Sequence, residues 1–326
     1  MIRNKLHRLL AALTAAALGI SLCGCSGNTP AGTSEEKLTV IATIFPAYDF
    51  ARQVFGDTAE VKMLLKPGQE SHSYDPSAKD IVEINGCDLF LYNGGESDQW
   101  VESVLRSSPE INTFRMTDAV SLLEEEVTEG MQSKEHDDDH DHDHDHEEEE
   151  YDEHVWTSPA NASAIIRALG VKAAELFPEQ AEQLKANADG YAEQTDQLDE
   201  DFQQLLAGEQ RYFVFGDRFP LLYFFKRYGL NYYAAFPGCG SETEPSAQTM
   251  TFLLEKLGQP DVIPAVFCIE LSSRRLADVL AEDAGVDTVE FHTCHNISAD
   301  DFAAGGPYVS LMQRNLSELS EILKVN

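Results

Sequence analysis

The feature that most restricts the fold is a long amphipathic stripe in the middle of the chain. After Pro178, apolar or small side chains recur at spacings of four and three residues, at Leu184, Ala188, Tyr191, Thr195, Leu198, Phe202 and Leu205. This spacing predicts one helix of about 30 residues, which would be roughly 45 Å long. A helix of that length in mid-chain is suited to joining two separate lobes.

Strand-like runs alternate with helical patterns on both sides of this stripe. Before it, the predicted strands are 38–45, 61–65 and 88–92, and the predicted helices begin near 46, 76, 97 and 158. After it, the predicted strands are 212–215, 231–236, 262–269 and 288–291, each followed by a helix. Such alternation favours parallel sheets. The predicted fold class is therefore α/β, with two lobes that each have a small, mostly parallel sheet flanked by helices, joined by one long rigid helix.

The N-terminal residues have the pattern of an export signal. Basic residues precede the apolar run 9–22, whose 14 residues are too few to span a membrane. Leu22 and Gly24, at positions −3 and −1 before Cys25, resemble the bacterial lipobox. This pattern predicts cleavage before Cys25, a lipid attached to its sulfur, and a protein anchored to the outer face of the bacterial cytoplasmic membrane.

These patterns divide the chain into five expected parts. They are a lipoprotein signal peptide at 1–24, a lipid-anchored tether at 25–37, an N-terminal α/β lobe at 38–177, a linking helix at 178–207, and a C-terminal α/β lobe at 208–326.

The charge of the chain indicates cations as ligands. Lys and Arg number 23 against 57 Asp and Glu, a net charge of −34, which excludes nucleic acid as a partner because phosphate backbones would be repelled. Residues 135–150 consist only of acids and histidine and should form a solvated loop. Its imidazoles are expected to give weak, exchanging zinc sites that concentrate metal: His136, His140, His142, His144 and His146.

Four cysteines remain after the expected processing, at 87, 239, 268 and 294. They form no Cys-x-x-Cys motif, so a thiolate zinc finger is not expected. Cys239 and Cys294 lie in loop-like contexts of a chain expected to be exported, which favours a disulfide between them. The sequence alone does not determine the connectivity.

The remaining histidines point to a metal site. Outside the signal and the acidic block, the chain has His72, His154, His292 and His295, each near the predicted end or start of a strand or helix. In open α/β sheets, ligands bind in the crevice beside the carboxyl ends of the strands, so histidines from both lobes could meet between the lobes. Four neutral imidazoles would form a closed tetrahedral zinc site with no position open for catalysis.

Two of these histidines lie in motifs that resemble a known family. The segments GQESHSYDP at 68–76 and DEHVWTSP at 152–159 resemble the two metal-ligand motifs of the zinc and manganese solute-binding proteins of ABC importers, also called cluster A-I or cluster 9. A His- and Asp-rich loop before the second motif is typical of the zinc-specific members. The resemblance covers about residues 38–326. It implies an extracytoplasmic, monomeric lipoprotein that binds Zn²⁺ between its lobes and delivers it to an ABC permease.

The second lobe departs from the family pattern. The segment 215–220, where the family usually has its third ligand histidine, contains none, and the usual fourth ligand, an Asp, falls near His292. The second-lobe ligand is therefore expected to be His295 or His292, and we favour His295. Asp217 is the alternative, as a ligand, as a partner that orients a histidine, or in an ion pair with Arg218. Glu270 is a weaker candidate.

Other functions remain open at this point. A manganese- or iron-binding importer component would favour carboxylate ligands, which Asp217 could supply. A surface adhesin or a metal-storage lipoprotein would share the export signal. A zinc hydrolase is not expected, because no His-Glu-x-x-His motif or nucleophile elbow occurs.

Overall fold

The computed structural model describes residues 37–69, 74–132, 151–238 and 244–324. Residues from Lys37 onward form one compact unit, and the expected signal, tether and Cys25 lie outside the described residues. Among the described residues, no helix is long and apolar enough to cross a membrane.

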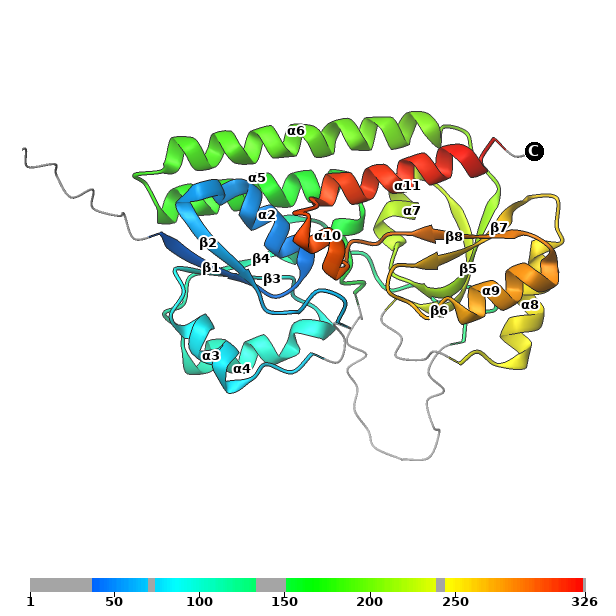
Figure 1. The fold of residues 1–326 in the computed structure, drawn as a ribbon, viewed down its shortest axis with the longest axis horizontal. Coiled ribbons are helices and arrows are strands. Elements are labelled where there is room, and N and C mark those ends of the chain that lie inside the picture. The colour runs from blue at the N-terminus through cyan, green and yellow to red at the C-terminus, as the bar shows by residue number, and fades with distance from the viewer. Residues whose placement is uncertain (1–36, 70–73, 133–150, 239–243, 325–326) are drawn as a thin grey trace, which may run out of the picture. The chain divides into compact units, whose positions relative to one another are not determined.

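The N-terminal lobe is built on a four-stranded parallel sheet in the order β2-β1-β3-β4 (Figure 1). Its strands are β1 (Leu38–Ala42), β2 (Ala59–Met63), β3 (Leu89–Tyr92) and β4 (Thr113–Arg115), and its helices are α2 (Phe45–Phe55), α3 (Ala78–Asn85), α4 (Gln99–Ser107) and α5 (Pro159–Leu176). Alternate residues of β1 point to opposite faces, as expected for a buried strand. Val40 packs in the core that includes α2 and α5, whereas Ile41 packs in the core formed with α3 and α4.

The C-terminal lobe repeats this arrangement with a parallel sheet in the order β6-β5-β7-β8. Its strands are β5 (Tyr212–Phe219), β6 (Asn231–Pro237), β7 (Val262–Ile269) and β8 (Asp287–Phe291), and its helices are α7 (Leu222–Tyr228), α8 (Ala247–Leu257), α9 (Arg275–Ala284), α10 (Ala299–Ala303) and α11 (Tyr308–Ile322). Phe213 packs in the core shared with α7 and α11, and Val214 packs in the core shared with α8 and α9. The predicted α/β fold class with two small parallel sheets is confirmed.

The long helix of the apolar stripe is α6 (Ala181–Leu205), which contacts α5, α2 and α11 and so packs against both lobes (Figure 1). It has 25 residues, fewer than expected, because the chain after Pro178 first forms a turn. At 1.5 Å per residue it is about 37 Å long. The stripe from Leu184 to Phe202 is buried. Helix α5 approaches closely at Gly170, where a Cβ atom would lie 2.4 Å from that of Ala188.

Candidate metal site

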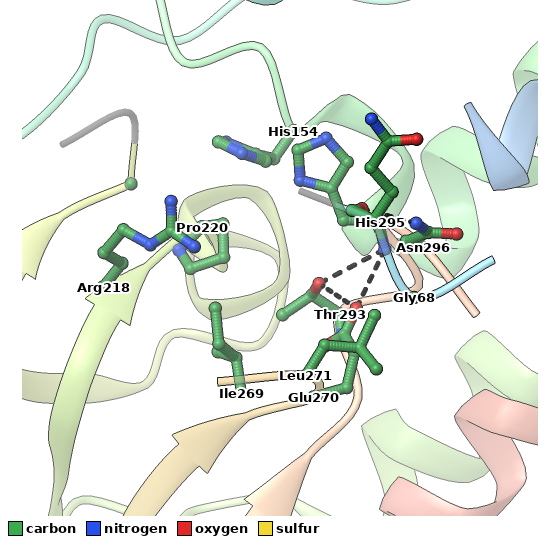
Figure 2. A pocket seen from close by; sticks show the side chains of 12 residues that line it. Gly68, His154, Arg218, Pro220, Ile269, Glu270, Leu271, Thr293, His295 and Asn296 are labelled. Atoms are coloured by element: carbon green, nitrogen blue, oxygen red, sulfur yellow. Dashed lines mark hydrogen bonds between the residues drawn. The ribbon is translucent and has the colours of Figure 1, made fainter. Parts of the chain in front are cut away.

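A cavity of about 110 Å³ lies between the two sheets, at the carboxyl ends of several strands (Figure 2). The N-terminal lobe contributes the turn that follows β2 and the segment that precedes α5. The C-terminal lobe contributes residues at and after the carboxyl ends of β5 and β7, and residues that follow β6 and β8. The lining residues are Gly68, Gln69, His154, Arg218, Pro220, Gly238, Ile269, Glu270, Leu271, Thr293, His295 and Asn296.

His154 is fully buried in this cavity and is held by Asp152. The Oδ1 atom of Asp152 lies 3.0 Å from Nδ1 of the imidazole and accepts a hydrogen bond of 2.7 Å from the backbone N–H of His154. Because an ionised carboxylate only accepts, Nδ1 carries the proton, and Nε2 is the nitrogen with a lone pair for a metal. Burial lowers the pKa of His154, but the charge and hydrogen bond of Asp152 outweigh it, and the pKa lies above 6.5.

Local structure fixes this segment in place. The hydroxyl of Tyr223 donates to the backbone carbonyl of Asp152, which connects the segment to α7 of the other lobe. Beyond His154, Ser158 accepts a bond from the N–H of Asn161 and caps α5, whose first residue is Pro159. Both residue types are typical of a helix start, so the segment that carries His154 ends at a defined helix.

His295 brings the second imidazole to the same cavity. Its ring centroid lies 5.2 Å from that of His154 and 5.0 Å from that of Trp156, and Figure 2 shows the two imidazoles beside each other. The Trp156 indole N–H donates to the carbonyl of Thr293 at 2.9 Å, which ties the loop of His295 to the segment of His154.

Glu270 fixes the loop of His295 from the end of β7. Its carboxylate accepts a bond from the backbone N–H of Thr293 at 2.7 Å. It also accepts bonds from the hydroxyl of Thr293 at 2.7 Å and from the backbone N–H of His295 at 3.1 Å, which are dashed in Figure 2. Three donors thus face one buried carboxylate. The structure gives Glu270 a clear role in positioning the loop.

The other second-lobe candidates are not among the residues that line the cavity. The Nδ1 atom of His292 accepts a bond from the backbone N–H of Cys294, and its backbone groups bond to Asn315. Asp217 accepts bonds from the backbone N–H groups of Arg218 and Ile269, at a bulge in β5, and lies in a neighbouring depression.

Several candidates lie outside the described residues. They are His72, Cys239 and the histidines of the acidic block, at 136, 140, 142, 144 and 146. Among the residues that the structure does describe, no group of three or more His, Cys, Asp or Glu side chains is placed to hold a metal ion. Cys294 is fully buried, and because Cys239 lies outside the described residues, the disulfide between them stays a prediction.

Sequence reasoning missed several residues that build the cavity. Trp156, Thr293 and Asn296 hold its walls together, and Arg218 lines it. Trp156 stands in the second histidine motif, and Asn296 follows His295 directly. Their closeness in sequence to a candidate ligand was the feature that could have identified them.

Comparisons with known proteins identify the family of the chain. A family model described as "ZnuA: Zinc-uptake complex component A periplasmic" matches residues 40–322. The chain belongs to this family. Membership in the ZnuA family confirms the resemblance drawn from the two histidine motifs, and it groups the chain with transport binding proteins and not with enzymes.

Individual relatives of this ZnuA-family chain come from species of Streptococcus and Bacillus. It is 30% identical over 321 residues to the zinc-binding lipoprotein AdcA of Streptococcus pneumoniae R6, covering 98% of this chain and 61% of the relative. It is 28% identical to the high-affinity zinc uptake system protein ZnuA of Bacillus subtilis 168, covering 96% of each. The Zn(II)-bound ZnuA-like domain of Streptococcus pneumoniae AdcA superposes with a TM-score of 0.71 and 29% identity, over 88% of this chain and 98% of that domain. The chain thus spans about three fifths of the full streptococcal relative.

Proposed function

We propose that this chain is the zinc-binding component of an ABC importer, which captures Zn²⁺ as cargo in the cavity between its lobes and delivers it to a membrane permease. The observation that carries the proposal is the pair of imidazoles of His154 and His295, which come from different lobes and lie 5.2 Å apart at one cavity. The relatives are named as zinc-binding and zinc-uptake proteins, which supports zinc as the cargo.

The proposed ligands are His72, His154 and His295. His72 stands three residues after Gln69, which lines the cavity. Nitrogen ligands favour zinc over manganese, because hard cations prefer oxygen. Glu270 is the one carboxylate among the described residues that line the cavity, and it already accepts three hydrogen bonds from Thr293 and His295. For a fourth ligand, His292 and Asp217 remain the candidates from the sequence. To bind through Nδ1, His292 would first have to give up the bond from the N–H of Cys294. Each oxygen of Asp217 accepts one backbone bond and keeps a second lone pair.

The acidic block and the lipobox complete the proposal. The block at 135–150 precedes His154 by only a few residues, so its five imidazoles would raise the concentration of zinc near the cavity. A lipid on Cys25 would hold the protein at the outer face of the cytoplasmic membrane, near its permease.

A competition titration with a zinc chelator tests the proposal. The protein is compared with a variant in which a glycine-serine linker replaces 135–150, and with a variant in which the five histidines of the block become glutamine. We expect one tight site in all three proteins and additional weak zinc binding only in the unmodified chain. Loss of the tight site together with the block would contradict the proposal and indicate a storage or surface-interaction protein.

A further inference from the structure

One of the buried residues that join the two walls of the cavity across the lobes is Asn296. Its side-chain amide N–H groups donate to two backbone carbonyls of the N-terminal lobe, those of Lys66 at 2.9 Å and Gln69 at 2.6 Å. Its Oδ1 accepts a bond from the backbone N–H of Ile297 at 2.7 Å. Both ends of the amide are therefore engaged, and the side chain is only 4% exposed.

The partner of Asn296 is a turn that leads directly to a proposed metal ligand. The N–H of Gln69 donates to the carbonyl of Lys66, which closes the turn, and Gly68 within it has a φ of +77°, a conformation that favours glycine. The N–H of Gly68 donates to the carbonyl of Ile297 at 2.9 Å. Three hydrogen bonds thus join this turn, 66–69, to the loop of the other lobe.

On the other side of the cavity, the loop 293–297 is held by Glu270 of its own lobe and by Trp156 of the N-terminal lobe. Glu270 accepts bonds from Thr293 and His295, and Trp156 donates to the carbonyl of Thr293. Asn296 therefore connects a loop that is already held in place to the turn that precedes His72. Figure 2 shows Asn296, Gly68 and His295 together at one side of the cavity.

We propose that Asn296 is a positioning residue of the metal site, which holds the turn 66–69 against the loop 293–297 and thereby slows the release of zinc. This inference rests on the proposed function, because it concerns the same cavity. Zinc bound by histidines from both walls leaves when the walls separate, and separation requires these three hydrogen bonds to break. Loss of the amide removes two of the three bonds and leaves the one between Gly68 and Ile297, so the turn separates from the loop more readily.

The test is the rate of zinc dissociation after a rapid excess of chelator, measured on the full-length protein. Asn296→Asp keeps the size of the side chain and the bond to Ile297 but places a carboxylate oxygen against two carbonyl oxygens. We expect dissociation to become about tenfold faster or more, the range typical when a partner that orients metal ligands is lost. Asn296→Ala removes the bonds without adding repulsion and should give a smaller increase. It also serves as the test if the aspartate variant does not fold.

Asn187→Ala is the matched control. Its amide donates to the carbonyl of Val54 at 2.9 Å and joins α6 to α2, and Asn187 is not among the residues that line the cavity. This variant should lower the unfolding temperature and leave zinc dissociation unchanged. The inference is overturned if both Asn296 variants release zinc at the wild-type rate. It is also overturned if Asn187→Ala accelerates zinc release as much as the Asn296 variants do. Neither result would affect the proposed function. If the wild-type chain does not bind zinc tightly, both the proposed function and this inference are overturned.

Discussion

A single carboxylate oxygen of Asp152, Oδ1, contacts two nitrogens of His154. It lies 3.0 Å from Nδ1 of the imidazole and 2.7 Å from the backbone nitrogen. Both residues are buried, so the pair fixes the tautomer and the orientation of the ring before any metal arrives. A site prepared in this way loses little conformational freedom on binding. Asp152 is therefore expected to contribute to zinc affinity although it does not touch the ion.

Substituting Asp152 with alanine should lower zinc affinity by about 10- to 100-fold, because His154 loses the partner that orients it. Asp152→Asn retains an oxygen that can accept both bonds and should lose less. Competition titration of the two variants against the wild type measures the difference. An alanine variant with wild-type affinity would show that the pair is structural only.

Zinc binding should weaken as the pH falls. Although burial opposes the charged form, Asp152 raises the pKa of His154 above 6.5, so protons compete with zinc already above that pH. Affinity is therefore expected to decline as the pH drops through a value higher than 6.5. In Asp152→Asn, which lacks the negative charge, the decline should begin at a lower pH. A decline at the same pH in both proteins would contradict this assignment.

Asp98 should make the stability of the N-terminal lobe depend on pH. Burial raises its pKa from 3.8 to about 6, although it accepts bonds from the N–H groups of Asn93 and Gly94. The folded state then holds a proton that the unfolded state has lost, so stability falls as the pH rises from about 4 to 6. The difference of about two pKa units corresponds to about 3 kcal/mol.

Asp98→Asn removes this titration and keeps an oxygen that can accept the same bonds. Its unfolding temperature, followed from pH 4 to pH 6, should fall less than that of the wild type. Parallel profiles for the two proteins would show that Asp98 titrates at its ordinary pKa.

A buried carboxylate at Asp49 ties the lobes together on the side of the long helix. It accepts bonds from Arg52 of α2 at 2.6 Å, from the hydroxyl of Tyr191 of α6 at 2.6 Å, and from the backbone N–H of Tyr308 at the start of α11 at 2.9 Å. Asp49→Ala leaves these donors without their acceptor and should lower the free energy of unfolding by about 3 kcal/mol. Chemical denaturation measures the loss, with Asp49→Asn as the milder control. A loss below about 1 kcal/mol would mean that water replaces the carboxylate.

Periodicity in the sequence was enough to predict most of the fold. The strand 262–269 occurs as predicted, because a long apolar run is a local signal. The strand Thr113–Arg115 was missed because it is a short edge strand with no buried side chain. Strand β5 was predicted to end at Phe215, but a bulge lets it continue to Phe219.

The candidate site was only partly accessible from the sequence. Its histidines stand in short motifs, so His154 and His295 were identified before their rings were seen side by side. Asn296 was not identified, because its role arises from bonds to carbonyls about 230 positions away in the chain. The bond between Trp156 and Thr293 could not be predicted for the same reason, because the two residues are 137 positions apart in the chain.

The measurement that tests the central claim most directly is an anomalous difference map, collected at the zinc edge from crystals of the zinc-loaded protein. The account predicts a strong peak in the cavity, about 2.0–2.1 Å from Nε2 of His154 and from a ring nitrogen of His295. A strongest peak away from both rings, or a cavity without a peak, would contradict it.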